Sequence, residues 1–236
     1  MNENTNEFAK KIDQIFSGDI EFVFGSAKPG DLPQETLPEI AFVGKSNSGK
    51  SSLINLITNR KSLSRVSNTP GRTKQINFFK VRNLFYLVDL PGFGYAKVSK
   101  KEHQIWEKLI LKYLNSRNTL RIIVFIIDSR RGILENDRQV INILQTYNIP
   151  FCLVFSKIDK LKSGELENFT SNLAQNSEVE LGKQLLMASL SNIDFTQFNE
   201  FELKNFFLIT NKLAYKYSEI TYLKSMLYKI LFFQED

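Results

Sequence analysis

One segment of the sequence has the residue types and the spacing of a loop that binds phosphate. It runs Gly44-Lys-Ser-Asn-Ser-Gly-Lys-Ser51 and matches the pattern G-x-x-x-x-G-K-[ST]. Glycine lets such a loop curl so that its backbone N–H groups point at a phosphate, and a following helix N-terminus adds partial positive charge. The pattern predicts that Lys50 reaches the β- and γ-phosphates of a nucleotide and that the Ser51 hydroxyl binds Mg²⁺. The predicted contacts in this loop are Gly44, Lys45, Ser46, Asn47, Ser48, Gly49, Lys50 and Ser51.

A second segment, Asp89-Leu-Pro-Gly92, follows an apolar run with the composition of a strand. An aspartate at this place can hold a water bound to Mg²⁺, and the N–H of Gly92 can reach a γ-phosphate because no side chain obstructs it. Alone, the pattern D-x-x-G is typical of an ordinary turn. Its position at a strand end favours the functional interpretation, with contacts from Asp89, Leu90, Pro91 and Gly92.

A third segment, Ser156-Lys-Ile-Asp159, follows another apolar run. The carboxylate of Asp159 can accept hydrogen bonds from the N1–H and the exocyclic amine of guanine, and adenine has no such pair of donors. The aliphatic stem of Lys157 can cover the plane of the base. Without the other two segments this would be interpreted as a charged loop after a strand. Together they predict binding of GTP and GDP, with contacts from Ser156, Lys157, Ile158 and Asp159.

Apolar strands that alternate with helices must place these loops, and this alternation predicts an α/β fold. We expect a mostly parallel six-stranded sheet with helices on both faces. The predicted strands are 39–43, 76–81, 84–89, 121–128, 151–155 and 184–188. The predicted helices are 8–16, 51–57, 99–115, 136–147 and one within 164–176.

Composition narrows the class of protein. The chain has 236 residues, with 31 lysines and arginines against 25 aspartates and glutamates, and therefore a net charge of +6. This charge favours an anionic partner such as nucleic acid or a phosphorylated ligand, but a solvated basic surface would explain it equally well. The single cysteine, Cys152, excludes a disulfide framework, and its apolar surroundings indicate a buried structural thiol. One histidine, His103, excludes a zinc site built from several histidines.

The longest fully apolar run, 122–127, is too short to span a bilayer, and the first residues lack the basic start and apolar core of a signal peptide. We therefore expect a cytoplasmic monomer without membrane insertion. The expected organisation is an N-terminal lead-in at 1–38, a GTP-binding domain at 39–194 and a helical segment rich in Phe, Tyr and Lys at 195–236. This last segment is interpreted as a helix packed on the domain or extending it. The alternative is a basic, aromatic surface for RNA.

Taken together, the three segments resemble the translation-factor-like GTPases of the Ras-type fold. This resemblance implies an α/β fold of the Ras-like P-loop GTPase type. More narrowly, the chain resembles the EngB family of bacterial ribosome-biogenesis GTPases, from about residue 22 to residue 189. The narrower resemblance depends on two runs, Asn68-Thr-Pro-Gly-Arg-Thr-Lys-Gln-Ile-Asn-Phe-Phe79 and Asp89-Leu-Pro-Gly-Phe-Gly-Tyr-Ala-Lys-Val98.

The resemblance implies slow hydrolysis of GTP to GDP, coupled to assembly of the large ribosomal subunit and linked to cell division and septation. It implies that Thr73 joins Ser51 as a protein ligand of Mg²⁺, and that backbone N–H groups of a base-side loop at 187–189 contact the guanine oxygen. Lys50, Thr73 and Gly92 are then the expected catalytic contacts. The further contacts that it implies are Gly71, Arg72, Thr73, Lys74, Gln75, Met187, Ala188 and Ser189.

Two positions depart from the expected pattern. Ser156 stands where the family usually has Thr or Asn, and its shorter reach is expected to lower nucleotide affinity. Phe93 stands where Ras has a glutamine that orients water, so we expect a monovalent cation, a ribosomal partner or both to accelerate a slow reaction. In similar GTPases an asparagine at the position of Asn47 is associated with bound K⁺; the alternative is that Asn47 only stabilises the loop.

Two other functions stay open. One is a GTP-gated scaffold that binds RNA or the ribosome, in which hydrolysis is only a reset step. The other is an ATP-dependent P-loop enzyme, and Asp159 argues against it.

Overall fold

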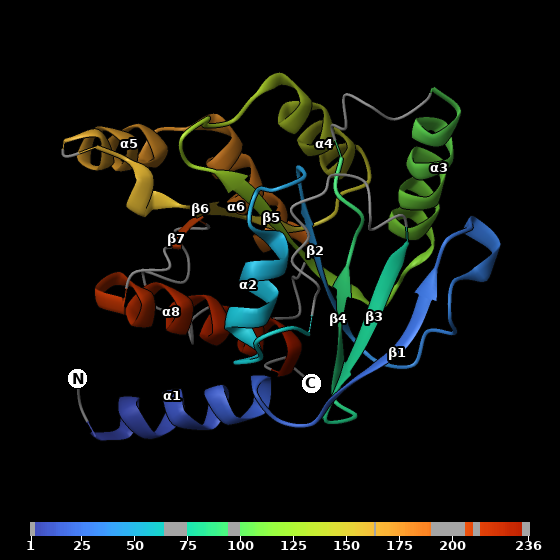
Figure 1. The fold of residues 1–236 in the computed structure, drawn as a ribbon, viewed down its shortest axis with the longest axis horizontal. Coiled ribbons are helices and arrows are strands. Elements are labelled where there is room, and N and C mark those ends of the chain that lie inside the picture. Colours follow the sequence, from blue (N-terminus) through green and yellow to red (C-terminus); the bar gives the residue numbers. More distant parts are fainter. Residues whose placement is uncertain are drawn as a thin grey trace.

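The structure, a computed structural model, describes residues 3–63, 75–93, 100–162, 164–189, 206–209 and 213–232. In this part of the chain a single sheet of seven strands, in the order β1-β3-β4-β2-β5-β6-β7, carries helices on both faces (Figure 1). The pairings β2–β4, β2–β5, β5–β6 and β6–β7 are parallel, and β1–β3 and β3–β4 are antiparallel. The predicted fold class, an α/β domain with a mostly parallel sheet, is therefore confirmed.

The strands are β1 Ile20–Ser26, β2 Glu39–Gly44, β3 Ile76–Val81, β4 Phe85–Asp89, β5 Leu120–Asp128, β6 Phe151–Ser156 and β7 Phe206–Ile209. The helices are α1 Glu3–Phe16, α2 Lys50–Ile57, α3 Lys100–Ser116, α4 Glu135–Thr146, α5 Glu165–Ala174, α6 Ser177–Ser189 and α8 Leu213–Phe232. Two short 3₁₀ helices, η1 Pro29–Asp31 and η2 Ile158–Lys160, lie in loops. None of these helices is long and apolar enough to cross a membrane.

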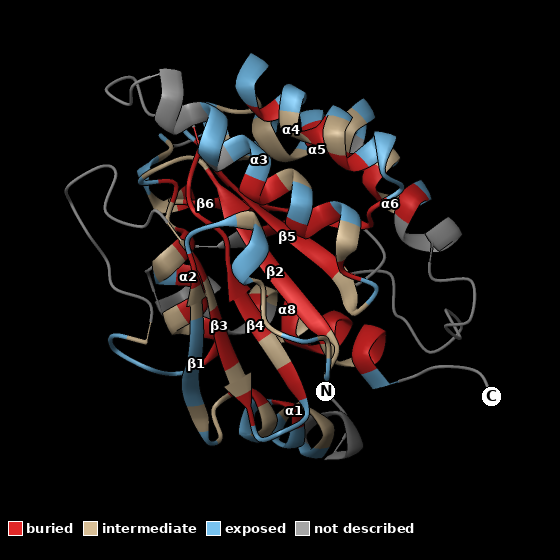
Figure 2. Ribbon diagram, turned by 90° about the vertical axis from the view of Figure 1, so that its right-hand side faces the viewer, coloured by how far each residue is buried: buried red, intermediate tan, exposed pale blue. Residues whose placement is uncertain are grey.

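The central strands are mainly apolar because helices cover both of their faces. Every residue of β2 and β6 is buried, and Figure 2 shows the middle of the sheet as a continuous buried layer. Alternate residues of β5 serve two separate cores. Ile122, Val124 and Ile126 pack in a core with α1, α2 and α8, whereas Ile123, Phe125 and Ile127 pack in a second core with α3, α4 and α6.

The sheet extends beyond both expected domain boundaries. Strand β1 lies within the expected lead-in and pairs antiparallel with β3, from Ile20 opposite Val81 to Ser26 opposite Ile76. Its side chains are largely exposed, with Phe22 56% and Phe24 36% accessible, because β1 is an edge strand. Strand β7 lies within the segment expected to be a helical extension. Residues 38 and 194 therefore do not separate the sheet from the rest of the chain.

The strand predicted at 184–188 is wrong, because these residues belong to helix α6. A short apolar run fits a strand or a helix, and its surroundings decide between them. Here Glu178 and Glu180 lie in the first turn, where carboxylates suit the helix dipole, and Val179 and Leu185 are buried in the second core. The strand beside β6 is instead β7, which pairs from Leu153–Phe206 to Ser156–Ile209.

Helices α1 and α8 lie side by side against the first core (Figure 1). The ammonium of Lys224 is 2.6 Å from the Asp13 carboxylate, and that of Lys229 is 5.9 Å from the centre of the Phe8 ring. The described part of α8 buries a stripe of apolar side chains, which are Ile220, Leu223, Met226, Leu227, Ile230 and Leu231.

Candidate functional site

The three predicted segments meet at the carboxyl edge of the parallel strands. Strand β2 ends at Gly44 and α2 begins at Lys50, so the first segment connects a central strand to a helix. In the sheet, Phe42 lies opposite Asp89 of β4, and Gly44 lies opposite Ile126 of β5. Ligands of open α/β sheets bind at this edge, so the three segments lie where a nucleotide is expected.

The backbone of the phosphate loop needs glycine at two positions. A Cβ at Gly44 would lie 2.6 Å from both the Ile126 carbonyl oxygen and the Ser48 hydroxyl, so no larger residue fits. Gly49 has φ of 105°, a left-handed conformation that favours glycine. Gly49 is also the N-cap of α2, and no side chain caps it. The first N–H groups of this helix are therefore directed toward a ligand site.

The D-x-x-G segment packs directly on this loop. A Cβ at Gly92 would lie 3.2 Å from the Gly44 carbonyl oxygen and from the Ser46 hydroxyl. The Ser46 N–H donates to the Phe93 carbonyl at 3.4 Å, and Lys45 and Phe93 form an isolated parallel bridge. The N–H of Leu90 donates to the Phe42 carbonyl at 3.0 Å. Both predicted phosphate-side segments thus form one surface.

A buried ion pair joins the same two segments. The ammonium of Lys50 contacts the carboxylate of Asp89, and the two residues are 9% and 2% exposed. A triphosphate that binds here competes with Asp89 for the Lys50 ammonium, because both ligands are anionic.

The loop also has polar groups suited to an anion. Within the described ranges, the buried hydroxyls of Ser46 and Ser48 have no hydrogen-bond partner. Buried polar groups normally are hydrogen-bonded, so an unpaired hydroxyl in a loop of this shape indicates room for a ligand oxygen. Ser51 is half-buried in the first turn of α2. A hydroxyl and a nearby carboxylate fit Mg²⁺, which takes a few protein oxygens together with phosphate oxygens and water.

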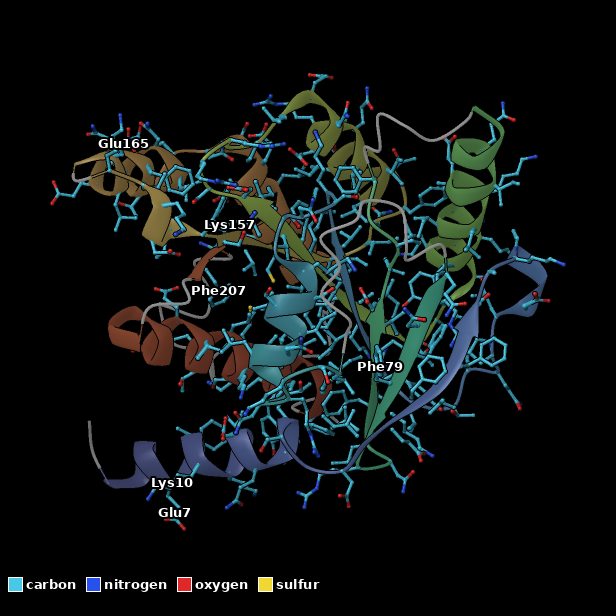
Figure 3. All side chains as sticks on the ribbon, in the orientation of Figure 1. Glu7, Lys10, Phe79, Lys157, Glu165 and Phe207 are labelled. Atoms are coloured by element: carbon cyan, nitrogen blue, oxygen red, sulfur yellow. The ribbon has the colours of Figure 1, made fainter. Side chains whose placement is uncertain are left out.

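The third segment touches the phosphate loop from the end of β6. The Ser156 hydroxyl lies within hydrogen-bond distance of the carbonyls of Ser48 and, at 3.2 Å, Ile127. The ammonium of Lys157, labelled in Figure 3, donates to the Asn47 carbonyl. Asp159 lies in η2, and its carboxylate is 3.6 Å from the Lys160 ammonium.

Asp128 and Arg130, which are not among the predicted site residues, also lie at this edge. Asp128 ends β5, and its carboxylate accepts hydrogen bonds from Lys157 at 2.8 Å and from two guanidinium nitrogens of Arg130 at 2.9 and 2.6 Å. Burial acts to raise the pKa of Asp128, but the hydrogen bonds from Arg130 and Lys157 outweigh it and hold that pKa well below its usual range. An acid directly after a buried strand, at the edge where the other segments end, is the signal that could have identified it.

Other predicted contacts are placed differently or not at all. Gly71, Arg72, Thr73 and Lys74 lie outside the described residues, and Gln75 donates from its side chain to Asn77 at 2.9 Å. Met187, Ala188 and Ser189 end helix α6 and do not follow a strand. The strand whose end lies opposite Ser156 is β7, which ends at Ile209, and the next residues lie outside the described part. The base-side loop that the resemblance implies at 187–189 therefore lies at the end of a helix and stays a prediction.

Cys152 lies inside β6 and is fully buried. Burial raises the pKa of its thiol far above the usual value. The prediction of a structural thiol is confirmed.

The fold and the site define a P-loop GTPase. A family model described as "50S ribosome-binding GTPase" matches residues 39–157. The probable GTP-binding protein EngB of Rickettsia akari (strain Hartford) is 44% identical over 190 residues, which cover 75% of this chain and 90% of that protein. That of Pelobacter propionicus (strain DSM 2379 / NBRC 103807 / OttBd1) is 47% identical over 171 residues, covering 72% and 86%. The chain belongs to the EngB family of GTP-binding proteins.

Solved structures agree on the fold. A crystal structure of a probable EngB protein has a TM-score of 0.55 at 21% identity and covers 82% of this chain and 98% of that chain. Era, in complex with MgGDPNP and nucleotides 1506–1542 of 16S ribosomal RNA, has a TM-score of 0.54 at 20% identity and covers 86% and 58%.

Proposed function

We propose that this GTPase is a switch in the assembly of the large ribosomal subunit, and that normal cell division and septation require it. The proposal is supported by the family model's description and by one feature of the site, the packing of Gly92 and Phe93 on the phosphate loop. A γ-phosphate that recruits the Gly92 N–H must rearrange this contact. GTP and GDP would therefore give the segment after Asp89 different arrangements.

We propose that Lys50, Thr73 and Gly92 make the catalytic contacts and that Ser51 and Thr73 are the protein ligands of Mg²⁺. Mg²⁺ would neutralise charge on the β- and γ-phosphates as the bond to the leaving phosphate breaks. The role of Lys50 is supported by its burial beside Asp89, and that of Gly92 by its close approach to the loop. The proposed base contact is Asp159, in η2 directly after the strand that touches the phosphate loop through Ser156.

A slow intrinsic reaction is proposed because of Phe93. Its side chain is 5% exposed, and its ring packs edge-on against Phe125 with 5.7 Å between the ring centres. A hydrocarbon side chain anchored in the core cannot orient an attacking water. We therefore propose that K⁺ near Asn47, a ribosomal partner or both supply the missing stabilisation, in the cytoplasm where ribosomes assemble.

The same feature of Phe93 also favours a second candidate, the GTP-gated scaffold in which hydrolysis is only a reset step. Co-sedimentation with ribosomal subunits, in GDP and in a non-hydrolysable GTP analogue, tests the proposal. A switch predicts nucleotide-dependent binding to the large subunit and faster turnover in its presence. Nucleotide-dependent binding with unchanged turnover would favour the scaffold, and equal binding in both nucleotides would contradict both. A Lys50→Ala variant, expected to bind nucleotide poorly, is the control.

A further inference from the structure

Asp128 links three elements of the site, although none of the recognised motifs contains it. It ends β5, one strand away from the phosphate loop and one strand away from the base-side segment. Its carboxylate is 9% exposed, whereas the Lys157 and Arg130 side chains that it binds are 29% and 46% exposed. A buried acid thus holds two partly exposed cations. The carboxylate is the fixed member of this group, and the long cationic side chains are the mobile ones.

Lys157 connects Asp128 to the phosphate loop. Its ammonium has three donors; one meets Asp128 and another meets the Asn47 carbonyl. Lys157 has a left-handed backbone with φ of 61°, which is uncommon and costly for a residue with a long side chain. Asn47 has φ of 63°, a conformation that asparagine adopts more readily. The hydrogen bond therefore joins one strained position to the phosphate loop. Without Asp128, this flexible ammonium would lose the partner that directs it at the loop.

Through Arg130, Asp128 also affects the electrostatic surroundings of Asp159. Its guanidinium binds Asp128 through two nitrogens, and its pKa is raised chiefly by that hydrogen bond and also by the charge of Asp159. Arg130 is therefore within electrostatic reach of the proposed base contact. By binding Arg130, Asp128 reduces the competition of this guanidinium for the Asp159 carboxylate.

We propose that Asp128 is a positioning residue for guanine nucleotide binding, which acts mainly through Lys157 on the phosphate loop at Asn47. It is not a catalytic residue, because it acts on other side chains. The proposal rests on nucleotide binding at this edge and not on the ribosomal role. Because the test uses free protein and GDP, failure of the ribosomal proposal would leave its result unchanged.

A double-mutant cycle on GDP affinity tests this proposal. Asp128→Asn keeps the size of the side chain and removes its charge, and we expect GDP affinity to fall about tenfold, the scale of one charge-assisted hydrogen bond. Lys157→Ala should weaken GDP at least as much. Because Asp128 acts through Lys157, the double variant should bind GDP no more weakly than Lys157→Ala alone.

A purely structural role for Asp128 predicts a different result. The unfolding midpoint of Asp128→Asn would fall, and its folded fraction would bind GDP as tightly as the wild type. Alternatively, Asp128→Asn would weaken GDP binding, and this loss would add to that of Lys157→Ala in the double variant. Either outcome would overturn the proposal. If Asp128→Asn does not fold, Asp128→Glu, which keeps the charge and moves the carboxylate, allows the same cycle. The matched control is Glu178→Gln, which breaks the 2.7 Å pair with Arg138 between α4 and α6 and should leave GDP affinity unchanged.

Discussion

The ammonium of Lys50 and the carboxylate of Asp89 form a buried ion pair between the phosphate loop and the end of β4. The two residues belong to different sequence motifs, and each is expected to serve the phosphate or its metal ion. In the structure they contact each other. The pair allows both charges to be buried, and a bound triphosphate would compete with Asp89 for the Lys50 ammonium.

This pair predicts two separable effects of Lys50→Ala. Loss of the ammonium should abolish tight binding of Mg²⁺–GTP, measured by titration with a fluorescent GTP analogue. It also leaves Asp89 buried without its cation, which should lower the free energy of unfolding by about 3–5 kcal/mol in the absence of nucleotide. Ser51→Ala should weaken Mg²⁺–GTP with little effect on stability. Wild-type affinity in both variants would contradict the assignment of the phosphate loop.

Asp159→Asn should weaken GTP and improve the relative binding of xanthosine triphosphate. The amide can donate to the C2 oxygen of xanthine, where the carboxylate prefers the guanine amine. Competition titrations with GTP, xanthosine triphosphate and ATP measure the change. An unchanged order of preference would exclude Asp159 as the base contact.

Glu39 should be important for stability and not for nucleotide binding. It is fully buried at the start of β2, opposite the site, and accepts hydrogen bonds from Tyr113 at 2.8 Å, from Arg117 at 3.0 Å and from Thr119 at 2.9 Å. Glu39→Ala should cost about 3–5 kcal/mol in urea unfolding, because Arg117 loses its buried partner. Tyr113→Phe should cost about 1.5–3 kcal/mol, as for a hydrogen bond to a charged group. A changed GDP affinity in folded Tyr113→Phe would show that the two ends of β2 are coupled.

The ion pairs of Asp128 should make the free energy of unfolding depend on pH in the acidic range. The pKa of Asp128 is lower in the folded protein than the unfolded value of about 3.9, so the folded state favours the charged form. This contribution is fully present above the unfolded pKa and is lost as pH falls through the folded pKa. Unfolding of the wild type and of Asp128→Asn should therefore differ by a constant amount above about pH 5 and by less below about pH 4. A difference that grew toward low pH would contradict a lowered pKa of Asp128 in the folded protein.

Potassium should raise the rate of GTP hydrolysis above that in sodium at equal ionic strength. Phe93 is held in the core and cannot help an attacking water, and Asn47 is exposed on the phosphate loop, where its side-chain carbonyl is available to a cation. Asn47→Ala should retain GDP binding and abolish the difference between the two salts. Equal rates in both salts, with and without ribosomes, would exclude the cation.

The sequence predicts best those features that depend on residues close together in the chain. The phosphate loop is a contiguous pattern, and strands such as β5 and β6 contain long apolar runs because they are covered on both faces. Strand β1 lacks this signal, since an edge strand exposes Phe22 and Phe24 and gains its structure from pairing with β3. The run at 184–188 was ambiguous because its length and composition fit either type of element, and packing in the second core made it helical.

The role of Asp128 shows the other limit of the sequence. Its partner Lys157 is distant in the chain, and only the register of β5 against β6 brings the two together. A motif cannot show such a pair, because neither residue alone indicates the contact.

The packing of α1 against α8 has a consequence for how the chain is made. The partners of Phe8 and Asp13 are Lys229 and Lys224, so helix α1 is synthesised long before the residues that complete its contacts. Contacts between such distant residues are entropically costly to close and tend to form late in folding. The face of α1 that contacts α8 therefore stays incompletely covered until α8 has been synthesised, and its docking brings together two helices that are far apart in the sequence.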